Sequence, residues 1–440
     1  MSLRLEHIYI LLFVLLSTLF GCEREFGAVR SVSDLLLSTD TISFDTLFAG
    51  DRSTTAILKL YNLSDEDLNV ASISLAGSDK SSFRINIDGQ ALSKLTNIRL
   101  YSKDSLYIFI DVTAGVDDGS SNAFYDDRID VISSGFSWSC ALMAYSLNAK
   151  VLDDVVITSD TLLTAELPFR IKGELKVESN ATLRLQEGTI VYMSPESRIE
   201  VYGSISAEGT TESPVVIRGD RLDKFYNNVP AQWDWICLNR GASNSLFRNV
   251  NISGAKYNLQ IDSAVSVVVE NSLMRDASEG VVLSYGGNVV IGNSLLYNSG
   301  GSLVKQVGGS LEMIHCTLSN RYEWDDRRVA SLVVRSAGDS GGPNLTTSLV
   351  ANSIITGNHQ PETECDTMLV VFDHCLTEKV NFVKAGRYNF HIDTASVAAR
   401  SANPDYLYRY PVDLDGNLRD VERPSIGVYE PKTVGEAPLK

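Results

Sequence analysis

The sequence has little positive charge to offset its acidic excess, few cysteines, and no apolar run long enough to cross a membrane. Its 440 residues carry a formal net charge of −17, and no basic run compensates for it. Nucleic acid and anionic lipid bind through clustered Lys and Arg, so this balance argues against both as partners. A strongly acidic polysaccharide is disfavoured as well, unless a local basic groove or a bound metal exists.

Cysteine usage excludes a disulfide-rich scaffold and gives no sign of zinc. The six cysteines form no CxxC pair, and no His–Cys spacing suggests a metal site. Five remain besides Cys22, and an odd number outside the cytosol cannot be a complete disulfide framework. We expect Cys316 and Cys375 to be core residues, although Cys365 and Cys375 could instead pair across a loop. No metal or other cofactor is expected.

Residues 1–22 have the composition of a targeting segment. Arg4 precedes an apolar run of thirteen residues, Ile8 to Phe20, whereas a helix that spans a bilayer needs about 20. The run ends in Leu19-Phe-Gly-Cys22, which resembles the lipobox of bacterial lipoproteins. This resemblance implies that Cys22 is lipidated and anchors the mature chain in the outer membrane. The acidic start Glu23-Arg-Glu25 resembles the signal that sends such proteins to the cell exterior. The alternative is an ordinary secretory signal that is cut elsewhere.

One six-residue phrase is repeated six times between residues 248 and 378. It begins with a polar residue, usually Asn, and carries an apolar residue at its fourth position. The first residues of successive copies lie 22, 22, 22, 37 and 21 positions apart. A period of roughly 20–30 residues is typical of a solenoid in which each copy is one coil. The copies begin at Asn249, Asn271, Asn293, His315, Asn352 and Asp373.

Equal positions of stacked coils form ladders about 4.8 Å apart, the spacing of neighbouring strands. At a bend, Asn side chains pass hydrogen bonds from coil to coil, which spares each buried amide a cost of about 1–3 kcal/mol. The fourth residues fill the interior, and we expect the first four of them to form one buried stack. The repeat therefore predicts a parallel β-helix. The fourth positions hold Ile252, Met274, Leu296, Leu318, Ile355 and Leu376.

The N-terminal part has a different pattern. A short polar stalk, residues 23–35, precedes about seven short runs of alternating apolar and polar residues between positions 36 and 150. This spacing is typical of an antiparallel β-sandwich of immunoglobulin type, and no chemistry is evident in it. Residues 151–435 have the short, evenly spaced strands of β-helix coils, and the join contains no Gly- or Ser-rich linker. The sequence thus predicts an all-β chain with two domains.

Two further segments make a family resemblance specific. Residues 209–223 read Gly-Thr-Thr-Glu-Ser-Pro-Val-Val-Ile-Arg-Gly-Asp-Arg-Leu-Asp, and Gln232-Trp-Asp-Trp-Ile236 follows. The tail contains Asp413-Leu-Asp-Gly-Asn-Leu-Arg419 and Ser425-Ile-Gly-Val-Tyr-Glu430. This order resembles bacterial surface lipoproteins with right-handed, pectate-lyase-like parallel β-helix repeats. The resemblance implies the fold, the location and a tail that closes the β-helix, but no reaction. We interpret residues 413–417 as a tight turn rather than a calcium loop.

The long step of the repeat marks an insertion. It exceeds the usual 22 residues by 15, and insertions in a solenoid emerge as loops that are often the binding face. Aromatic rings provide stacking faces and guanidinium groups provide forked donors, so we predict a ligand platform here. The alternative is that Trp324 folds down to cover strand edges. The predicted platform consists of Tyr322, Trp324, Asp325, Asp326 and Arg327, with Tyr226 and Trp235 on the same flank.

No catalytic residue is evident. Glycoside hydrolases need two carboxylates on one groove, lyases need a base beside a cation, and no two carboxylates stack at matching positions of neighbouring copies. We therefore interpret the protein as a non-catalytic, cell-surface module that binds a glycan or a surface protein. The alternatives are a polysaccharide lyase or glycoside hydrolase of this fold, and a structural or adhesive stalk.

Overall fold

The computed structural model describes residues 34–115, 123–337 and 344–431, which fall into two compact units divided after Asn148. Each unit is described by itself. Cys22 and most of the predicted stalk lie outside the described residues, and the first strand begins at Leu35. Among the described residues, no helix is both long and apolar enough to cross a membrane.

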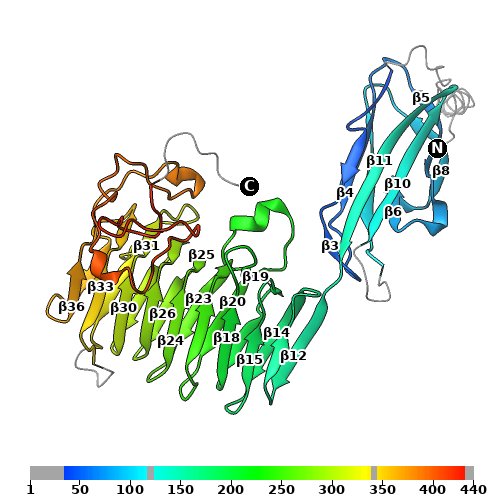
Figure 1. Ribbon diagram of the computed structural model, residues 1–440. Coiled ribbons are helices and arrows are strands. Elements are labelled where there is room, and N and C mark those ends of the chain that lie inside the picture. Colours follow the sequence, from blue (N-terminus) through cyan, green and yellow to red (C-terminus); the bar gives the residue numbers. More distant parts are fainter. Residues whose placement is uncertain (1–33, 116–122, 338–343, 432–440) are drawn as a thin grey trace, which may run out of the picture. The chain divides into compact units, whose positions relative to one another are not determined.

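The first unit is a sandwich of two sheets, as the alternating runs predict (Figure 1). Alternate residues of each strand point inward, and they form one apolar core that includes Leu58, Ile108 and Val131. One sheet has the order β1 (Leu35–Leu37), β4 (Ala56–Asn62), β9 (Ser105–Val112), β6 (Phe83–Ile87), β7 (Gln90–Ala91). The other has the order β2 (Thr41–Ser43), β11 (Phe136–Leu147), β10 (Phe124–Ser133), β5 (Leu68–Leu75), β8 (Lys94–Leu100), and β3 (Leu47–Phe48) also pairs with β11. The short η1 (Ser78–Lys80) follows β5.

The second unit is a parallel β-solenoid, which confirms the fold predicted from the repeat (Figure 1). Each complete coil contributes one strand to each of three faces, here called faces A, B and C. Face A contains β16 (Ile190–Met193), β19 (Val215–Gly219), β22 (Val250–Ser253), β25 (Leu273–Ala277), β28 (Leu295–Ser299), β31 (Thr317–Asn320) and β34 (Ile354–Gly357). Face B contains β17 (Arg198–Val201), β20 (Trp233–Leu238), β23 (Ala255–Ile261), β26 (Gly280–Tyr285), β29 (Ser302–Val307), β32 (Leu332–Arg335) and β35 (Thr363–Cys365).

Face C and the first coils complete the solenoid. The long β14 (Phe169–Val177) pairs with β12 (Lys150–Ile157) on one side, and on the other side with both β16 and β17, so faces A and B diverge from it. Face C contains β13 (Thr161–Leu163), β15 (Thr182–Leu185), β18 (Ser204–Glu208), β21 (Ser245–Arg248), β24 (Ser266–Glu270), β27 (Asn288–Gly292), β30 (Ser310–Ile314), β33 (Ser348–Ala351) and β36 (Val370–Asp373).

The predicted interior stack is confirmed. Ile252 pairs in register with Met274, Met274 with Leu296, and Leu296 with Leu318, along face A. All four side chains are completely buried and belong to one continuous apolar core. The 22-residue period thus places chemically equal side chains one strand spacing apart.

The polar first position of the phrase lies at the bend from face C to face A. Its backbone adopts the left-handed conformation, which Asn and His tolerate better than most residues do. Only part of the ladder is bonded from coil to coil: Asn293 Nδ2 donates to Asn271 Oδ1 at 2.9 Å, and Asn352 Nδ2 lies 3.0 Å from His315 Nε2. The residues with positive φ at this bend are Asn249, Asn271, Asn293, His315, Asn352 and His374.

The predicted register of the last copy is wrong by one residue. Asp373 pairs with Ala351 inside the sheet, and the left-handed bend falls on His374. The step from Asn352 is therefore 22 residues, as elsewhere. Leu376 pairs with Ile354, which occupies the third position of its copy, so it lies outside the interior stack. Two adjacent polar residues, Asp and His, both suit the first position, and only the strand pairing distinguishes them.

The two cysteines of the repeat occupy its second position, where the other coils have Ser or Val and where the Cys thiol makes the same hydrogen bond as the Ser hydroxyl. Ser272, Ser294 and Ser353 each donate a hydrogen bond to the carbonyl oxygen two residues earlier. Cys316 and Cys375 make the same contact through Sγ, at 3.4 Å in both cases. All five cysteines of the described segments are free, so the considered pairing of Cys365 with Cys375 is not formed.

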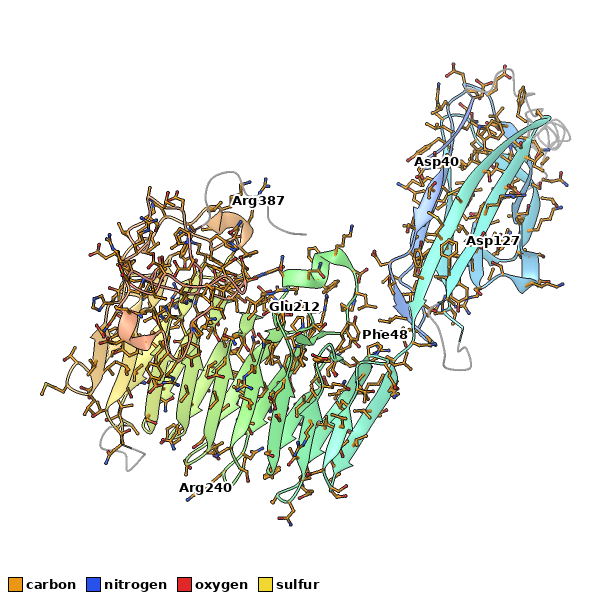
Figure 2. The ribbon with its side chains drawn as sticks, in the orientation of Figure 1. Asp40, Phe48, Asp127, Glu212, Arg240 and Arg387 are labelled. Atoms are coloured by element: carbon orange, nitrogen blue, oxygen red, sulfur yellow. The ribbon has the colours of Figure 1, made fainter. Side chains whose placement is uncertain are left out.

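The tail after β36 turns back and covers the outer side of face A. Third-position residues such as Leu295 and Ile354 point outward, and Val380, Ile392 and Val428 of the tail pack against them. The tail includes the short η4 (Ala385–Arg387) and η5 (Pro404–Tyr406). Arg387 of η4 and Arg240, in a turn after face B, lie at opposite edges of the solenoid (Figure 2).

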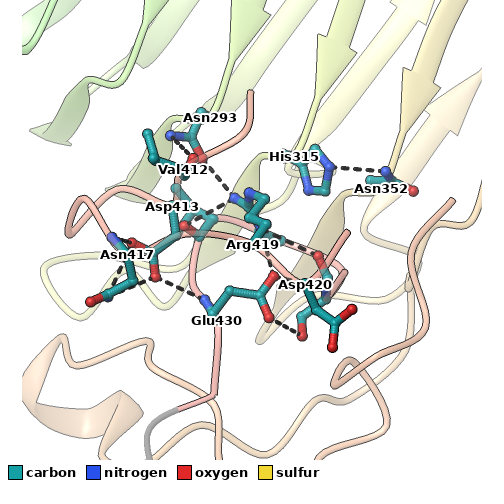
Figure 3. A network of polar contacts seen from close by, with 12 residues as sticks. Asn293, His315, Asn352, Val412, Asp413, Asn417, Arg419, Asp420 and Glu430 are labelled. Atoms are coloured by element: carbon teal, nitrogen blue, oxygen red, sulfur yellow. Dashed lines mark hydrogen bonds and ion pairs between the residues drawn. The ribbon is translucent and has the colours of Figure 1, made fainter. Parts of the chain in front are cut away.

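Arg419 fastens this tail to the bend ladder (Figure 3). Its buried guanidinium donates through Nη2 to Asn293 Oδ1 at 2.7 Å and through Nη1 to Glu430 Oε1 at 3.3 Å. Asp413 Oδ1 accepts the backbone N–H groups of Asp415 and Asn417, so residues 413–417 form the predicted turn. These contacts hold the tail against the flank of the solenoid.

Candidate functional site

Two insertions interrupt an otherwise tight edge between faces A and B. The first, residues 220–232, contains η2 (Lys224–Asn228), and the second is the predicted loop, residues 321–331. The three A-to-B turns between them contain only one or two residues each. Four coil steps separate the insertions, about 19 Å at 4.8 Å per step. η2 stands above this edge of the solenoid (Figure 1).

The two insertions meet through aromatic rings. The Phe225 ring lies edge-on to Tyr226, with centroids 5.2 Å apart, and edge-on to Trp324, with centroids 6.5 Å apart. The guanidinium carbon of Arg221 lies 4.0 Å from the Tyr226 centroid. Phe225 is 71% exposed and Trp324 is 49% exposed. We call Phe225, Tyr226 and Trp324 the flank cluster; the structure thus joins two of the predicted platform residues through Phe225.

A buried ion pair holds the second insertion. The Arg327 and Glu362 side chains are 1% and 0% exposed and approach to 2.5 Å. Arg327 also donates to the carbonyl oxygens of Asn320 and Val329, and Glu362 accepts the hydroxyl of Ser331. The Arg327 guanidinium is therefore occupied inside the protein, where it fixes the loop and faces no ligand.

The remaining loop residues divide between support and surface. Tyr322 is buried, and a Cβ placed on the adjacent Gly300 would lie 2.2 Å from the Ser278 carbonyl oxygen and 3.1 Å from the Tyr322 ring. Burial raises the pKa of Tyr322, and nearby carboxylates including Asp325 add to the effect. Asp325 and Asp326 are exposed beside Trp324, and Asp325 Oδ1 accepts the backbone N–H of Asp326 at 2.7 Å.

Trp235 lies on face B and is not joined to the flank cluster by any ring contact among the described residues. Its Nε1 donates to Glu200 Oε1 at 2.7 Å. Trp233, two residues earlier, is fully buried and donates to the Ser253 carbonyl at 2.9 Å. Residues two apart normally share one face of a strand, so one buried and one partly exposed tryptophan show that the alternation is interrupted between positions 233 and 235.

A second polar ladder, which the sequence reasoning missed, supports the first insertion. Asp276 is fully buried, pairs with Arg275 and accepts a hydrogen bond from Asn298 Nδ2. Burial raises the pKa of Asp276, although Arg275 and Asn298 oppose the shift. Arg275 Nη1 donates to the Asn227 carbonyl at 3.1 Å and to Asn228 Oδ1 at 2.9 Å, which ties the η2 segment to face A. The 22-residue step from Asp276 to Asn298 was the available signal.

Comparisons with known proteins add little to this geometry. No protein-family description and no curated protein matches the sequence. Among solved structures, the catalytic domain of a family 87 α-1,3-glucanase in complex with tetrasaccharides is 10% identical over 79% of this chain and 67% of its own, with a TM-score of 0.17. A family 123 glycoside hydrolase from Clostridium perfringens is 9% identical over 26% of this chain and 25% of its own, with a TM-score of 0.19.

A protein of unknown function from Porphyromonas gingivalis is 12% identical over 28% of this chain and 59% of its own, with a TM-score of 0.19. This chain therefore spans only a quarter of the length of the clostridial enzyme and less than two thirds of the length of the Porphyromonas gingivalis protein. Similarities at these scores carry no argument about activity, and any function must be argued from the chain's own residues.

Proposed function

We propose that this protein is a cell-surface lipoprotein, anchored through Cys22, whose solenoid binds a neutral glycan at the flank cluster without cleaving it. The observation that carries this proposal is the exposed corner formed by Phe225 and Trp324, whose ring planes meet at 84°. Solitary exposed aromatics need no explanation. Here two insertions four coils apart converge to present them, and each insertion is fixed by a buried charge.

A right-angled pair of rings suits a sugar. One ring can stack on the C–H face of a pyranose while the other forms a wall at its side. Asp325 and Asp326 are exposed beside Trp324 and can accept hydrogen bonds from sugar hydroxyls. The same carboxylates would repel an acidic sugar, which is why the proposed ligand is neutral.

Preorganisation supports binding over a merely covering role for Trp324. The loop that carries it is fastened by the Arg327–Glu362 pair, and the η2 segment by Arg275. A rigid site loses less conformational entropy when a ligand binds. An indole that only covered strand edges would be largely buried, whereas Trp324 remains 49% exposed.

The test is binding of a panel of neutral oligosaccharides to the full chain with Cys22→Ser, measured by glycan array and then by calorimetry. Trp324→Ala and Phe225→Ala should each weaken binding of the selected glycan about tenfold or more, about 1.4 kcal/mol. Tyr408→Ala is the matched control, because Tyr408 is an aromatic residue of the same unit that is 82% exposed and does not belong to the flank cluster. Unchanged affinity in both flank variants would refute the site, and release of shortened sugars by the wild type would refute the non-catalytic assignment.

A further inference from the structure

The outer face of the five-stranded sheet in the sandwich carries a cluster of charged residues that the proposed function does not use. Asp111 on β9 accepts hydrogen bonds from two arginines. Arg52 donates through Nε at 2.9 Å and through Nη2 at 2.7 Å, one to each carboxylate oxygen. Arg84 on β6 donates to Oδ1 through Nε at 3.0 Å and through Nη2 at 2.7 Å, and its Nη2 also reaches Thr113.

The cluster of Arg52, Arg84 and Asp111 contains two cationic groups and one anionic group, so one positive charge is not neutralised within it. Burial alone would raise the pKa of Asp111, but the hydrogen bonds from Arg52 and Arg84 lower it overall, so the carboxylate is charged. Two guanidinium groups and one carboxylate leave a net charge of +1. The Arg52 and Arg84 side chains are 60% and 55% exposed, while that of Asp111 is only 12% exposed. Within the described segments, neither Nη1 group has a hydrogen-bond partner, so both can donate to a ligand.

A depression of about 470 Å³ lies against the cluster. Such a volume falls within the roughly 300–1,000 Å³ typical of small-molecule sites. Its walls combine the apolar Ala91 and Phe109 with the polar Thr55 and Asn86.

Sheet alternation extends the apolar part of this surface. Phe109 and Tyr107 both point outward from β9, with ring centroids 6.4 Å apart and planes inclined by 25°. The two rings are 38% and 41% exposed. Exposed rings beside unused guanidinium donors are typical of a surface that holds a flat, polar ligand with a charged substituent.

We propose that this depression binds a saccharide that carries a monoanionic substituent, a carboxylate or a sulfate ester. Arg52 and Arg84 contact the anion through their Nη1 groups, and the sugar ring lies toward Phe109. The surplus of one positive charge matches a monoanion, because a phosphate monoester would leave a second negative charge uncompensated. The chain as a whole carries a net charge of −17, so a local basic site is what an acidic glycan would need in order to bind.

The test uses the full chain with Cys22→Ser and three probes: trigalacturonic acid, its methyl ester, and a sulfated galactose trisaccharide. In low salt, calorimetry should show binding of the acid or of the sulfated sugar. It should show no measurable binding of the neutral ester. Which anion binds more tightly distinguishes carboxylate from sulfate. Arg52→Gln and Arg84→Gln should each raise Kd at least tenfold.

Arg128→Gln is the matched control, because Arg128 lies in the same unit, pairs with Asp130 and is 61% exposed. It should leave Kd unchanged, as should Trp324→Ala, which separates this site from the flank cluster. Circular dichroism and urea unfolding establish that each variant is folded. Equal binding of acid and ester by the wild type, or no binding of either anionic probe, would overturn the proposal without any variant. Full affinity in folded Arg52→Gln and Arg84→Gln would overturn it as well.

Discussion

His315 is the one histidine among the asparagines at the bend from face C to face A in the preceding coils, so the other coils suggest Asn as its substitute. His315 occupies a position at which other coils have Asn, and it is completely buried. Its Nε2 accepts a hydrogen bond from Asn352 Nδ2 at 3.0 Å. Burial, together with the nearby Arg419 guanidinium, lowers the pKa of His315 from 6.5 to about 3. The imidazole is therefore neutral in the folded protein at any pH above that value.

The sign of the effect on stability follows from linkage. Below pH 6.5 the unfolded chain binds a proton at His315 and the folded chain does not, so the stabilising contribution is lost as pH falls from 6.5 toward 3. Each pH unit in this window costs about 1.4 kcal/mol. Between pH 7.5 and pH 4.5 the loss is therefore about 2–3 kcal/mol. In His315→Asn this loss is absent, because an amide does not titrate.

The assay is urea unfolding of wild type and His315→Asn at pH 7.5 and pH 4.5, followed by tryptophan fluorescence. Three of the four tryptophans, Trp233, Trp235 and Trp324, report on the solenoid. Carboxylates also destabilise the protein in acid, but they do so in both proteins, so the difference between the two isolates residue 315. Between pH 7.5 and pH 4.5, the free energy of unfolding should fall by about 2–3 kcal/mol less in the variant than in the wild type. An identical pH dependence would refute the buried, neutral imidazole.

Three further changes test the solenoid and its attachment. Leu296→Ala removes one member of the interior stack and should lower the free energy of unfolding by about 2–5 kcal/mol in urea titration; a loss below 1 kcal/mol would contradict tight packing. Arg327→Met leaves the Glu362 carboxylate buried without its partner and should cost about 3–5 kcal/mol, whereas Arg328→Met, at the exposed neighbouring position, should change stability by less than about 0.5 kcal/mol. Cys22→Ser should abolish fatty-acid labelling and release the protein from the membrane fraction; unchanged labelling would exclude the lipid anchor.

The periodic parts of this fold could be predicted because every coil packs its equivalent residues in the same way against the next coil. A 22-residue step returns the chain to an equal position one strand spacing away, so Met274 and Leu296 must meet whatever the loops do. The alternation of apolar and polar residues specifies the sandwich strands for a similar reason. Local chemistry also identified the turn at residues 413–417, because Asp, Gly and Asn favour that backbone.

The candidate site was only half predictable. The sequence indicated the inserted loop, since it breaks the period, and it indicated the aromatic residues that this loop carries. It assigned Arg327 to the ligand surface, but the structure buries that side chain against Glu362, 35 residues later. Nothing in the local sequence distinguishes Arg327 from the exposed Arg328 beside it. Only the position of residue 362 on the next coil decides which of the two is enclosed.

The period, the interior side chains and most of the strand alternation follow from the sequence alone, because they depend on interactions that recur at a fixed spacing. The tertiary structure decided which non-repeating residues meet. It brought Phe225 to Trp324 across four coils, Arg419 to Asn293 across 126 positions, and two arginines to Asp111 on one sheet. Such contacts depend on where the folded backbone places each segment, and the repeat period does not specify the distance between two non-repeating residues.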